Sequence, residues 1–368
     1  MIEYFILFVV FFIEILYFAN IDKTKERSKV CAWFFFIQFF ILFAFRSPKI
    51  LCDTPQYYKH FTYLEDTTSI FGYSSKDRYE AGYQILEHFV HNLISDEFII
   101  FNIFTTFIIL GSLSYFLYKY SACTWLAFLL FFLTRLIFDD IIAVRQGIAS
   151  AIGLLGYKYL IKFSYIKYFL VILLASLFHS SAIALLIFIP VVYPSLSINV
   201  KIKLIVVLSI LLFYIFPSLM AQYMTNSDAY GVDYAQSSVK KGAFGLIGIY
   251  NFVNALVFVL YILYVKKLQL KKFSDSDPLF IISLLFLSVS FLSIRMWVLI
   301  RVVMLLLPFL CIYIADLFMA NIHESKKRKK IKHATYLLIC FMIASYTFFT
   351  FTRPSWIALF PYEFYFDF

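Results

Sequence analysis

Charged residues are scarce in this sequence, and their scarcity excludes a water-soluble protein. Only 15% of the 368 residues are charged, whereas 62% are hydrophobic and the mean hydropathy is +0.85. A soluble domain has about a quarter of its residues charged, so this chain has too little polar surface to cover a globule in water. Because apolar runs recur along its whole length, the sequence predicts a single integral membrane domain over residues 1–368.

Cysteine is also sparse, and the five cysteines show no spacing typical of a disulfide framework or a metal site. Four of them lie inside apolar runs, where a free thiol behaves as a small hydrophobic group. We therefore predict no metal and no cofactor. The apolar residues 2–18 have no basic region before them and no small-residue cleavage site after them, so they predict a retained first helix.

The apolar runs predict an all-α polytopic membrane protein with about twelve transmembrane helices, since a helix needs roughly 20 apolar residues to cross the bilayer. Residues 168–193 could form one helix or two. Loop charge favours two, because Lys and Arg gather on the cytoplasmic side and a break at 178–181 keeps the basic segment 266–272 there. The predicted spans are 2–19, 30–46, 97–118, 122–138, 146–162, 166–178, 180–194, 204–220, 244–265, 279–294, 297–319 and 333–352.

The two predicted faces of the membrane differ in their basic residues. The inner loops contain 18 of the 23 lysines, whereas seven of the nine arginines lie outside or in the outward half of a span. The planar guanidinium group is suited to bidentate recognition of phosphate or carboxylate. We therefore expect both termini and a functional site on the outward face. The basic residues 326–330 are interpreted as an anchor on anionic lipid, and no nucleic acid is expected as a partner.

Two outward loops, about 46–96 and 221–243, carry polar groups of that face. Asp53-Thr54-Pro55 predicts the start of a short helix, with a capping residue followed by proline. From Tyr83 onward the apolar residues have the spacing of an amphipathic helix, which we expect at the membrane interface. Carboxylates beside tyrosines are suited to sugars, which have hydroxyl edges and an apolar face.

Several short motifs follow one another from the second span to the C-terminus. They are Arg46; Asp53-Thr54 with Tyr57; Tyr79-Glu80-Ala81-Gly82-Tyr83; Arg145-Gln146; Phe178-His179-Ser180-Ser181-Ala182; Arg301 seven residues before Pro308; and Pro361-Tyr362. In this order, spacing and outward placement they resemble the EpsG/Wzy type of bacterial polysaccharide polymerase.

The resemblance implies a GT-C-like fold and a multi-pass glycosyltransferase of the bacterial cytoplasmic (inner) membrane, with its active face outward. Members of the family join undecaprenyl-diphosphate-linked oligosaccharides into the O-antigen of lipopolysaccharide, capsule or exopolysaccharide. A sugar hydroxyl of one lipid-linked unit, the acceptor, would displace the lipid diphosphate of another, the donor. Donor, acceptor and membrane lipids are the implied partners, and the resemblance leaves room for a chain-length regulator.

Such a reaction needs a base for the attacking hydroxyl and charge stabilisation on the departing diphosphate. The candidate catalytic residues are Asp53, Glu80 and His179. Each has a structural alternative. Asp53 and Glu80 could serve as helix caps, and His179 could cap its turn with Ser180 and Ser181 or contact phosphate.

Arginines are expected to hold the diphosphate in place of a metal. Arg145 could instead pair with Asp139 or Asp140, and Arg301 could form a structural ion pair within its span. Charge at depth in the membrane favours a functional role. The candidate ligands of substrate and diphosphate are Arg46, Arg145, Gln146, Arg295, Arg301, Tyr57 and Tyr83.

Two other classes of function stay open. A flippase for the same lipid-linked oligosaccharide would show internal repeats and charges at the midplane, whereas we find no repeat and the charges cluster outward. A related outward-facing ligase or acyltransferase is the other alternative. The large outer loop and the order of the motifs favour the polymerase.

The predicted topology can be tested by labelling. In a variant without the five native cysteines, a cysteine at Asn226 should react with a membrane-impermeant thiol reagent in intact cells. A cysteine at Ser274 should react only after the cells are opened. The reverse pattern would place the arginine-rich face toward the cytosol and contradict the topology.

Overall fold

A computed structural model gives the fold over most of the chain. It describes residues 2–21, 25–50, 53–64, 79–134, 141–193, 196–225, 243–269, 278–295, 299–319, 324–352 and 363–367. Throughout these residues the regular structure is helical, and the one β-bridge pairs Arg46 with Phe364. The prediction of an all-α protein is confirmed.

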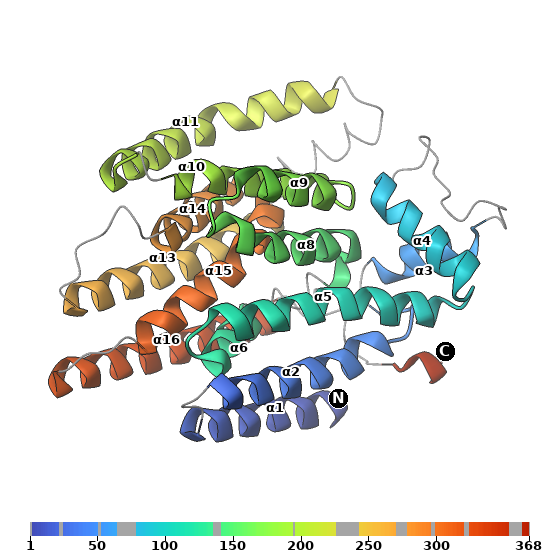
Figure 1. Cartoon of the computed structure of the whole chain (residues 1–368), viewed down its shortest axis with the longest axis horizontal. Coiled ribbons are helices and arrows are strands. Elements are labelled where there is room, and N and C mark those ends of the chain that lie inside the picture. Colours follow the sequence, from blue (N-terminus) through green and yellow to red (C-terminus); the bar gives the residue numbers. More distant parts are fainter. Residues whose placement is uncertain are drawn as a thin grey trace. The chain divides into compact units, whose positions relative to one another are not determined.

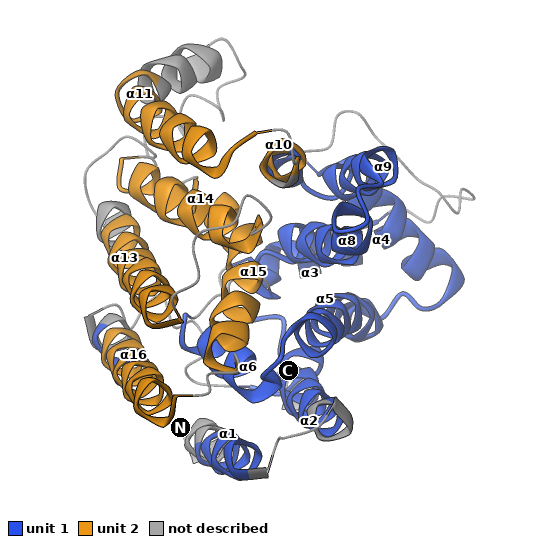
Figure 2. Cartoon of the chain, turned by 60° about the vertical axis from the view of Figure 1, so that its left-hand side comes forward, with its two compact units in different colours: residues 1–186, 347–368 blue, residues 187–346 orange. Residues whose placement is uncertain are grey.

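The chain divides into two compact units, which are described separately (Figure 2). Unit 1 comprises residues 1–186 and 347–368, and unit 2 comprises residues 187–346. Both units are helical. The single membrane domain stays a prediction.

Unit 1 is built on helices that run side by side (Figure 1). Helix α5 packs against α2 and α8, and α8 packs against α9. The short helices α3 and α4 lie at the end of the unit where α5 begins, and both contact α5. The elements are α1 (Ile2–Ile21), α2 (Lys25–Ala44), α3 (Thr54–Thr62), α4 (Ala81–Leu93), α5 (Phe98–Tyr120), α6 (Thr124–Leu133), α8 (Val144–Leu160), α9 (Tyr165–Ser176), the 3₁₀ helix η1 (Ser180–Ile187) and η4 (Tyr365–Asp367).

Unit 2 is centred on α14 and α15. Helix α14 packs against α10, α11, α13 and α15, and nearly every residue of α15 from 303 to 317 is buried. The elements are α10 (Phe188–Val192), α11 (Ile198–Thr225), α13 (Ala243–Gln269), α14 (Pro278–Ser293), α15 (Ile300–Met319) and α16 (Ser325–Thr352), whose last turns belong to unit 1.

Each predicted span overlaps helical structure within the described residues, although the seventh, 180–194, is divided between η1 and α10. Of the helices within the described ranges, five are long and apolar enough to cross a membrane, which indicates a multi-pass membrane protein. Others are short: α6 has 10 residues, which rise about 15 Å in a hydrocarbon core of about 30 Å. The count of twelve spans and the GT-C-like fold therefore stay predictions. The five are α5, Ile198–Ile215, Ile247–Gln269, α15 and Ser325–Phe348.

The predicted break between the sixth and seventh spans is confirmed. Helix α9 ends at Ser176 and η1 begins at Ser180. The two elements run back along each other, since the Tyr168 hydroxyl donates to the carbonyl of Leu185 at 2.9 Å and Ala175 packs with Ala182. Residues 177–179 thus form the tip of a hairpin.

Phenylalanine fills the contact between α1, α2 and α6. Phe11 packs against Phe35, Phe39 and Phe132, with ring centroids 5.3, 5.6 and 4.4 Å away. Phe35 also stacks on Phe128 at 4.7 Å. Tilted and offset ring pairs of this kind stabilise a helix contact beyond the area they bury, which gives a physical use for these five phenylalanines.

Helix α11 exposes a continuous apolar surface. Val206, Val207, Leu208, Ile210 and Leu211 are each about half exposed. A patch of this length is unfavourable in water, whereas lipid tails solvate it well. The surface of α11 therefore supports the assignment to a membrane.

Gly82 joins α4 to the hairpin tip. Its N–H donates to the carbonyl of Leu177 at 2.8 Å, and a Cβ at Gly82 would lie 2.9 Å from that carbonyl oxygen. Backbone cannot move aside as a flexible side chain can. Only glycine therefore lets the first turn of α4 rest directly on the hairpin.

Replacing Gly82 by alanine should separate α4 from the hairpin. We expect G82A to destabilise the protein by about 1–3 kcal/mol, as other overpacked contacts do, and to lower the melting temperature in detergent. Gly111→Ala is the control, because its Cβ would lie an ordinary 3.8 Å from Phe36 and alanine favours a helix. Equal melting temperatures for G82A and the wild type would contradict this role of Gly82.

Candidate functional site

Arg145 and Glu80 form an ion pair at the centre of the candidate site. Arg145 is the second residue of α8, and Glu80 directly precedes α4. The guanidinium Nη1 donates to the Glu80 carboxylate, and the two side chains are 21% and 23% exposed. The predicted alternative partners, Asp139 and Asp140, lie outside the described residues. The pair is therefore mostly buried yet still open to a ligand.

Two tyrosines enclose the Arg145 guanidinium. Its carbon lies 4.7 Å from the centroid of the Tyr79 ring, a favourable cation–π distance. The Tyr57 hydroxyl also interacts with the guanidinium. Burial raises the pKa of Tyr57 to about 12, although the charge of Arg145 opposes the rise. The hydroxyl therefore keeps its proton at neutral pH and can donate a hydrogen bond.

Two buried polar atoms of this region have no hydrogen-bond partner among the described residues. The Nε of Arg145 is buried and has no hydrogen-bond acceptor among the described residues, and the same holds for the hydroxyl of Thr54. Thr54 lies one turn before Tyr57 on the buried face of α3. Unpaired buried donors are rare in folded proteins. Each of the two groups is therefore a candidate contact for a ligand.

Buried polar residues pack against Tyr57 and Tyr79. Tyr83 is fully buried, with its ring 5.6 Å from Tyr57 and 5.3 Å from Tyr79. Nδ1 of His60 lies 2.9 Å from the buried carboxylate of Glu87. Burial raises the pKa of Tyr83, and the charge of Glu87 raises it further. Tyr83 thus packs against the two rings that border Arg145, and its contact with substrate stays a prediction.

His179 lies at the hairpin tip and is 6% exposed. Its Nδ1 accepts a hydrogen bond from the Ser181 N–H at 3.1 Å, so the neutral imidazole has its proton on Nε2. The predicted cap of the turn is therefore present. With Nδ1 occupied, Nε2 is a donor, which suits contact with a phosphate oxygen better than the role of a base.

The hairpin lies next to the Arg145 site. The carbonyl of Leu177, two residues before His179, accepts a hydrogen bond from the N–H of Gly82 in α4. Ala149, one turn after Arg145, packs with Ala175 and Ala182 on either side of His179. The structure thus brings the motifs that contain Tyr57, Glu80, Arg145 and His179 together within unit 1.

Asp53 and Gln146 flank this cluster. Asp53 occupies the N-cap position of α3, which confirms the predicted helix start, but its side chain makes no capping hydrogen bond. The Asp53 charge instead acts on Tyr57. Gln146 is 1% exposed beside Arg145 at the start of α8.

Arg46 caps the end of α2. It is 1% exposed, and its Nη1 donates to the carbonyl of Phe43 at 2.6 Å. The C-terminal segment pairs with this turn, since the Ser47 N–H donates to the backbone carbonyl of Glu363 at 2.8 Å. A cation at the C-terminus of a helix is favourable, so the structure gives Arg46 a structural role; its contact with diphosphate stays a prediction.

Arg295 and Arg301 belong to unit 2. The Arg295 guanidinium lies 5.4 Å from the Phe213 ring of α11, and its side chain is exposed. Arg301 is half-buried in the first turn of α15. Both stay predicted ligands of the diphosphate.

The sequence analysis did not single out Tyr79, Thr54, His60 or Glu87 as site residues. Signals for three of them were present: Thr54 and His60 lie three residues on either side of Tyr57, on one face of α3, and Glu87 is four residues after Tyr83. Nothing in the sequence pairs Tyr79 with Arg145, since 66 positions separate them.

A double-mutant cycle tests the Arg145–Glu80 pair. We expect R145Q and E80Q each to leave a mostly buried charge without its partner, at a cost of about 1 kcal/mol or a fall of about 2 °C in melting temperature. The melting temperature of the double variant E80Q/R145Q should fall by much less than the sum of the two single falls. Additive losses would show that the two charges do not interact in the folded protein.

Comparison with known protein families identifies the family of the chain. The family model described as the EpsG family matches residues 29–364, nearly the whole chain. Comparison with curated proteins and with solved structures gave no match. The matched residues include every motif gathered around Arg145, and the chain belongs to the EpsG family.

Proposed function

We propose that the protein is a membrane glycosyltransferase that polymerises undecaprenyl-diphosphate-linked oligosaccharide repeat units at the outer leaflet. Its family is consistent with a polysaccharide polymerase. The observation that carries the finer proposal is the Arg145 cluster: a mostly buried guanidinium, flanked by tyrosines, whose Nε–H has no acceptor among the described residues.

The diphosphate of the donor lipid occupies this cluster. Arg145 offers Nε–H and the guanidinium edge to phosphate oxygens, the bidentate geometry that suits phosphate. The Tyr57 hydroxyl and Nε2–H of His179 are further donors. Glu80 and the Tyr79 ring hold the guanidinium in place, so less reorganisation is needed when negative charge develops. Arg295 and Arg301 of unit 2 stay predicted ligands of the diphosphate.

The reaction is a displacement at the anomeric carbon of the donor sugar. The acceptor hydroxyl oxygen forms a bond to that carbon while the bond from the carbon to the diphosphate oxygen breaks. The electron pair leaves with the polyprenyl diphosphate, and the hydroxyl proton passes to a carboxylate base.

Asp53 is the carboxylate we assign as the base. It occupies the N-cap position of α3, and its charge acts on Tyr57, whose hydroxyl interacts with Arg145. Glu80 is engaged by Arg145. In this arrangement Glu80 is a positioning residue. Tyr57 and Tyr79 offer aromatic surface on which a sugar face can stack.

Complementation of a deletion strain tests the proposal. Arg145→Lys keeps the charge but loses the planar fork, so we expect long polymer to fall at least tenfold while products with a single repeat unit persist. Asp53→Asn should give the same ladder. The control is Arg328→Gln, an arginine in the predicted cytoplasmic anchor, which should leave the ladder unchanged.

The ladder also separates this function from the alternatives. A flippase defect would remove single-unit products from the outer surface together with the polymer. Full-length polymer from both R145K and an Arg301→Ala variant, each expressed at the wild-type level, would disprove the cationic site.

A further inference from the structure

Helices α13 and α16 of unit 2 enclose a groove that the proposed reaction does not use. It has a volume of about 620 Å³. Two hydrogen bonds connect the helices along it, from Tyr261 to Thr335 and from Ser345 to Asn254, both 2.8 Å long. The larger apolar side chains that line it include Val257, Leu260, Tyr264, Leu337, Leu338 and Phe341.

The apolar walls of the groove are open to the surroundings. Leu260 is 54% exposed, Tyr264 44% and Leu337 71%. Between Lys330 and Phe341 the groove follows α16 for eleven residues, or about 16 Å. This length is close to half of the hydrocarbon core of about 30 Å, so one acyl chain of a single leaflet fits along it.

Basic side chains line one end of the groove. Lys326, Lys329, Lys330 and His333 are spaced by three and four residues, so they share the face of α16 that borders it. All four are exposed. Among the described residues the three lysines make no ion pair. The acid at this end of α16, Glu324, pairs instead with Lys327 at 2.9 Å.

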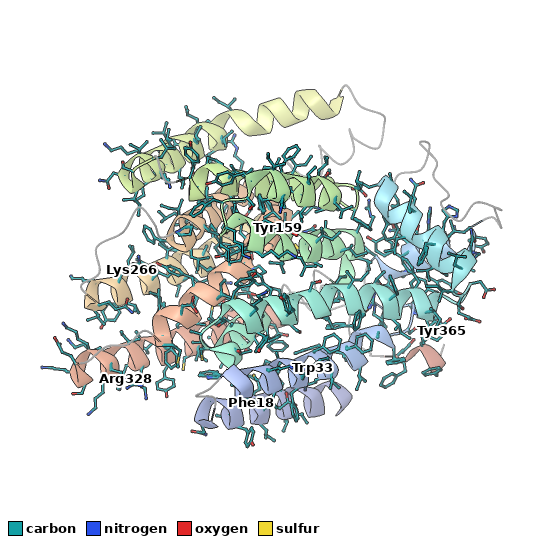
Figure 3. The ribbon with its side chains drawn as sticks, in the orientation of Figure 1. Phe18, Trp33, Tyr159, Lys266, Arg328 and Tyr365 are labelled. Atoms are coloured by element: carbon teal, nitrogen blue, oxygen red, sulfur yellow. The ribbon has the colours of Figure 1, made fainter. Side chains whose placement is uncertain are left out.

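The same segment has basic residues on its opposite face. Arg328 and Lys332 are exposed but do not line the groove; Figure 3 labels Arg328 on the first turns of α16. Positive side chains at a helix N-terminus also repel the positive end of the helix dipole. An anion bound at this end would relieve that repulsion.

We propose that this groove is a binding site for one anionic phospholipid. The phosphate contacts Lys329 and Lys330, with Lys326 and His333 beside it, and one acyl chain lies between Leu260 and Leu337. Basic pockets between membrane helices bind acidic lipid headgroups in this way. The groove has basic side chains at one end and an apolar wall about as long as one leaflet is thick. This combination selects a lipid over a soluble anion.

Native mass spectrometry of the full-length protein in detergent tests the site. With dioleoyl phosphatidylglycerol and dioleoyl phosphatidylcholine in equal amounts, we expect one phosphatidylglycerol to be retained with about tenfold preference. The variant K329Q/K330Q should lose that preference. The matched variant R328Q/K332Q removes two positive charges from the opposite face and should keep it. Equal loss in both variants would show attraction by net charge alone and would overturn the site.

Two further arms identify the occupant. Leu260→Trp fills the apolar wall and should reduce retention of phosphatidylglycerol although every lysine is intact; unchanged retention would overturn the acyl-chain contact. Inorganic phosphate at millimolar concentration should not displace the lipid. Displacement by phosphate, or by an equimolar amount of undecaprenyl phosphate, would show that the groove does not select a phospholipid.

Discussion

The contact between Gly82 and the Leu177 carbonyl fixes the geometry on which the candidate site depends. It presses the first turn of α4 onto the tip of the α9–η1 hairpin. Glu80 and Tyr79 immediately precede that turn, so the same contact carries a carboxylate and an aromatic ring to Arg145 on α8. A glycine with no polar side chain thus determines where the charged groups of three segments meet.

The Arg145–Glu80 pair is buried enough to be stable and exposed enough to be reached by a ligand. A fully buried pair gains little over an apolar contact, since desolvation offsets the attraction, whereas an exposed pair contributes almost nothing. At 21% and 23% exposure the two side chains lie between these limits. Glu80 compensates the guanidinium charge in this structure, and in the proposed function a phosphate would compete for the same donors.

Local patterns predicted local structure well, and pairings distant in sequence poorly. Apolar run length located the helices, and Asp53-Thr54-Pro55 and the break at His179 marked real helix ends. The partner of Arg145 was not predictable, because Asp139 and Asp140 are nearer in sequence than Glu80. Likewise, nothing near Arg46 indicates that the backbone of Glu363 pairs with Ser47. Such contacts follow from tertiary packing, which no local spacing encodes.

The length of α9 bears on how deep the candidate site lies in the membrane. Helix α9 has 12 residues, which rise about 18 Å, less than a hydrocarbon core of about 30 Å. If α9 begins at the inner surface, as Lys162 and Lys167 predict, the tip at His179 lies below the outer surface. Helix α4 then has to reach inward to meet it, and the Gly82 contact is where they meet. Because the effective dielectric constant falls with depth, a guanidinium held there would, in the proposed reaction, stabilise a departing diphosphate more strongly than it would in water.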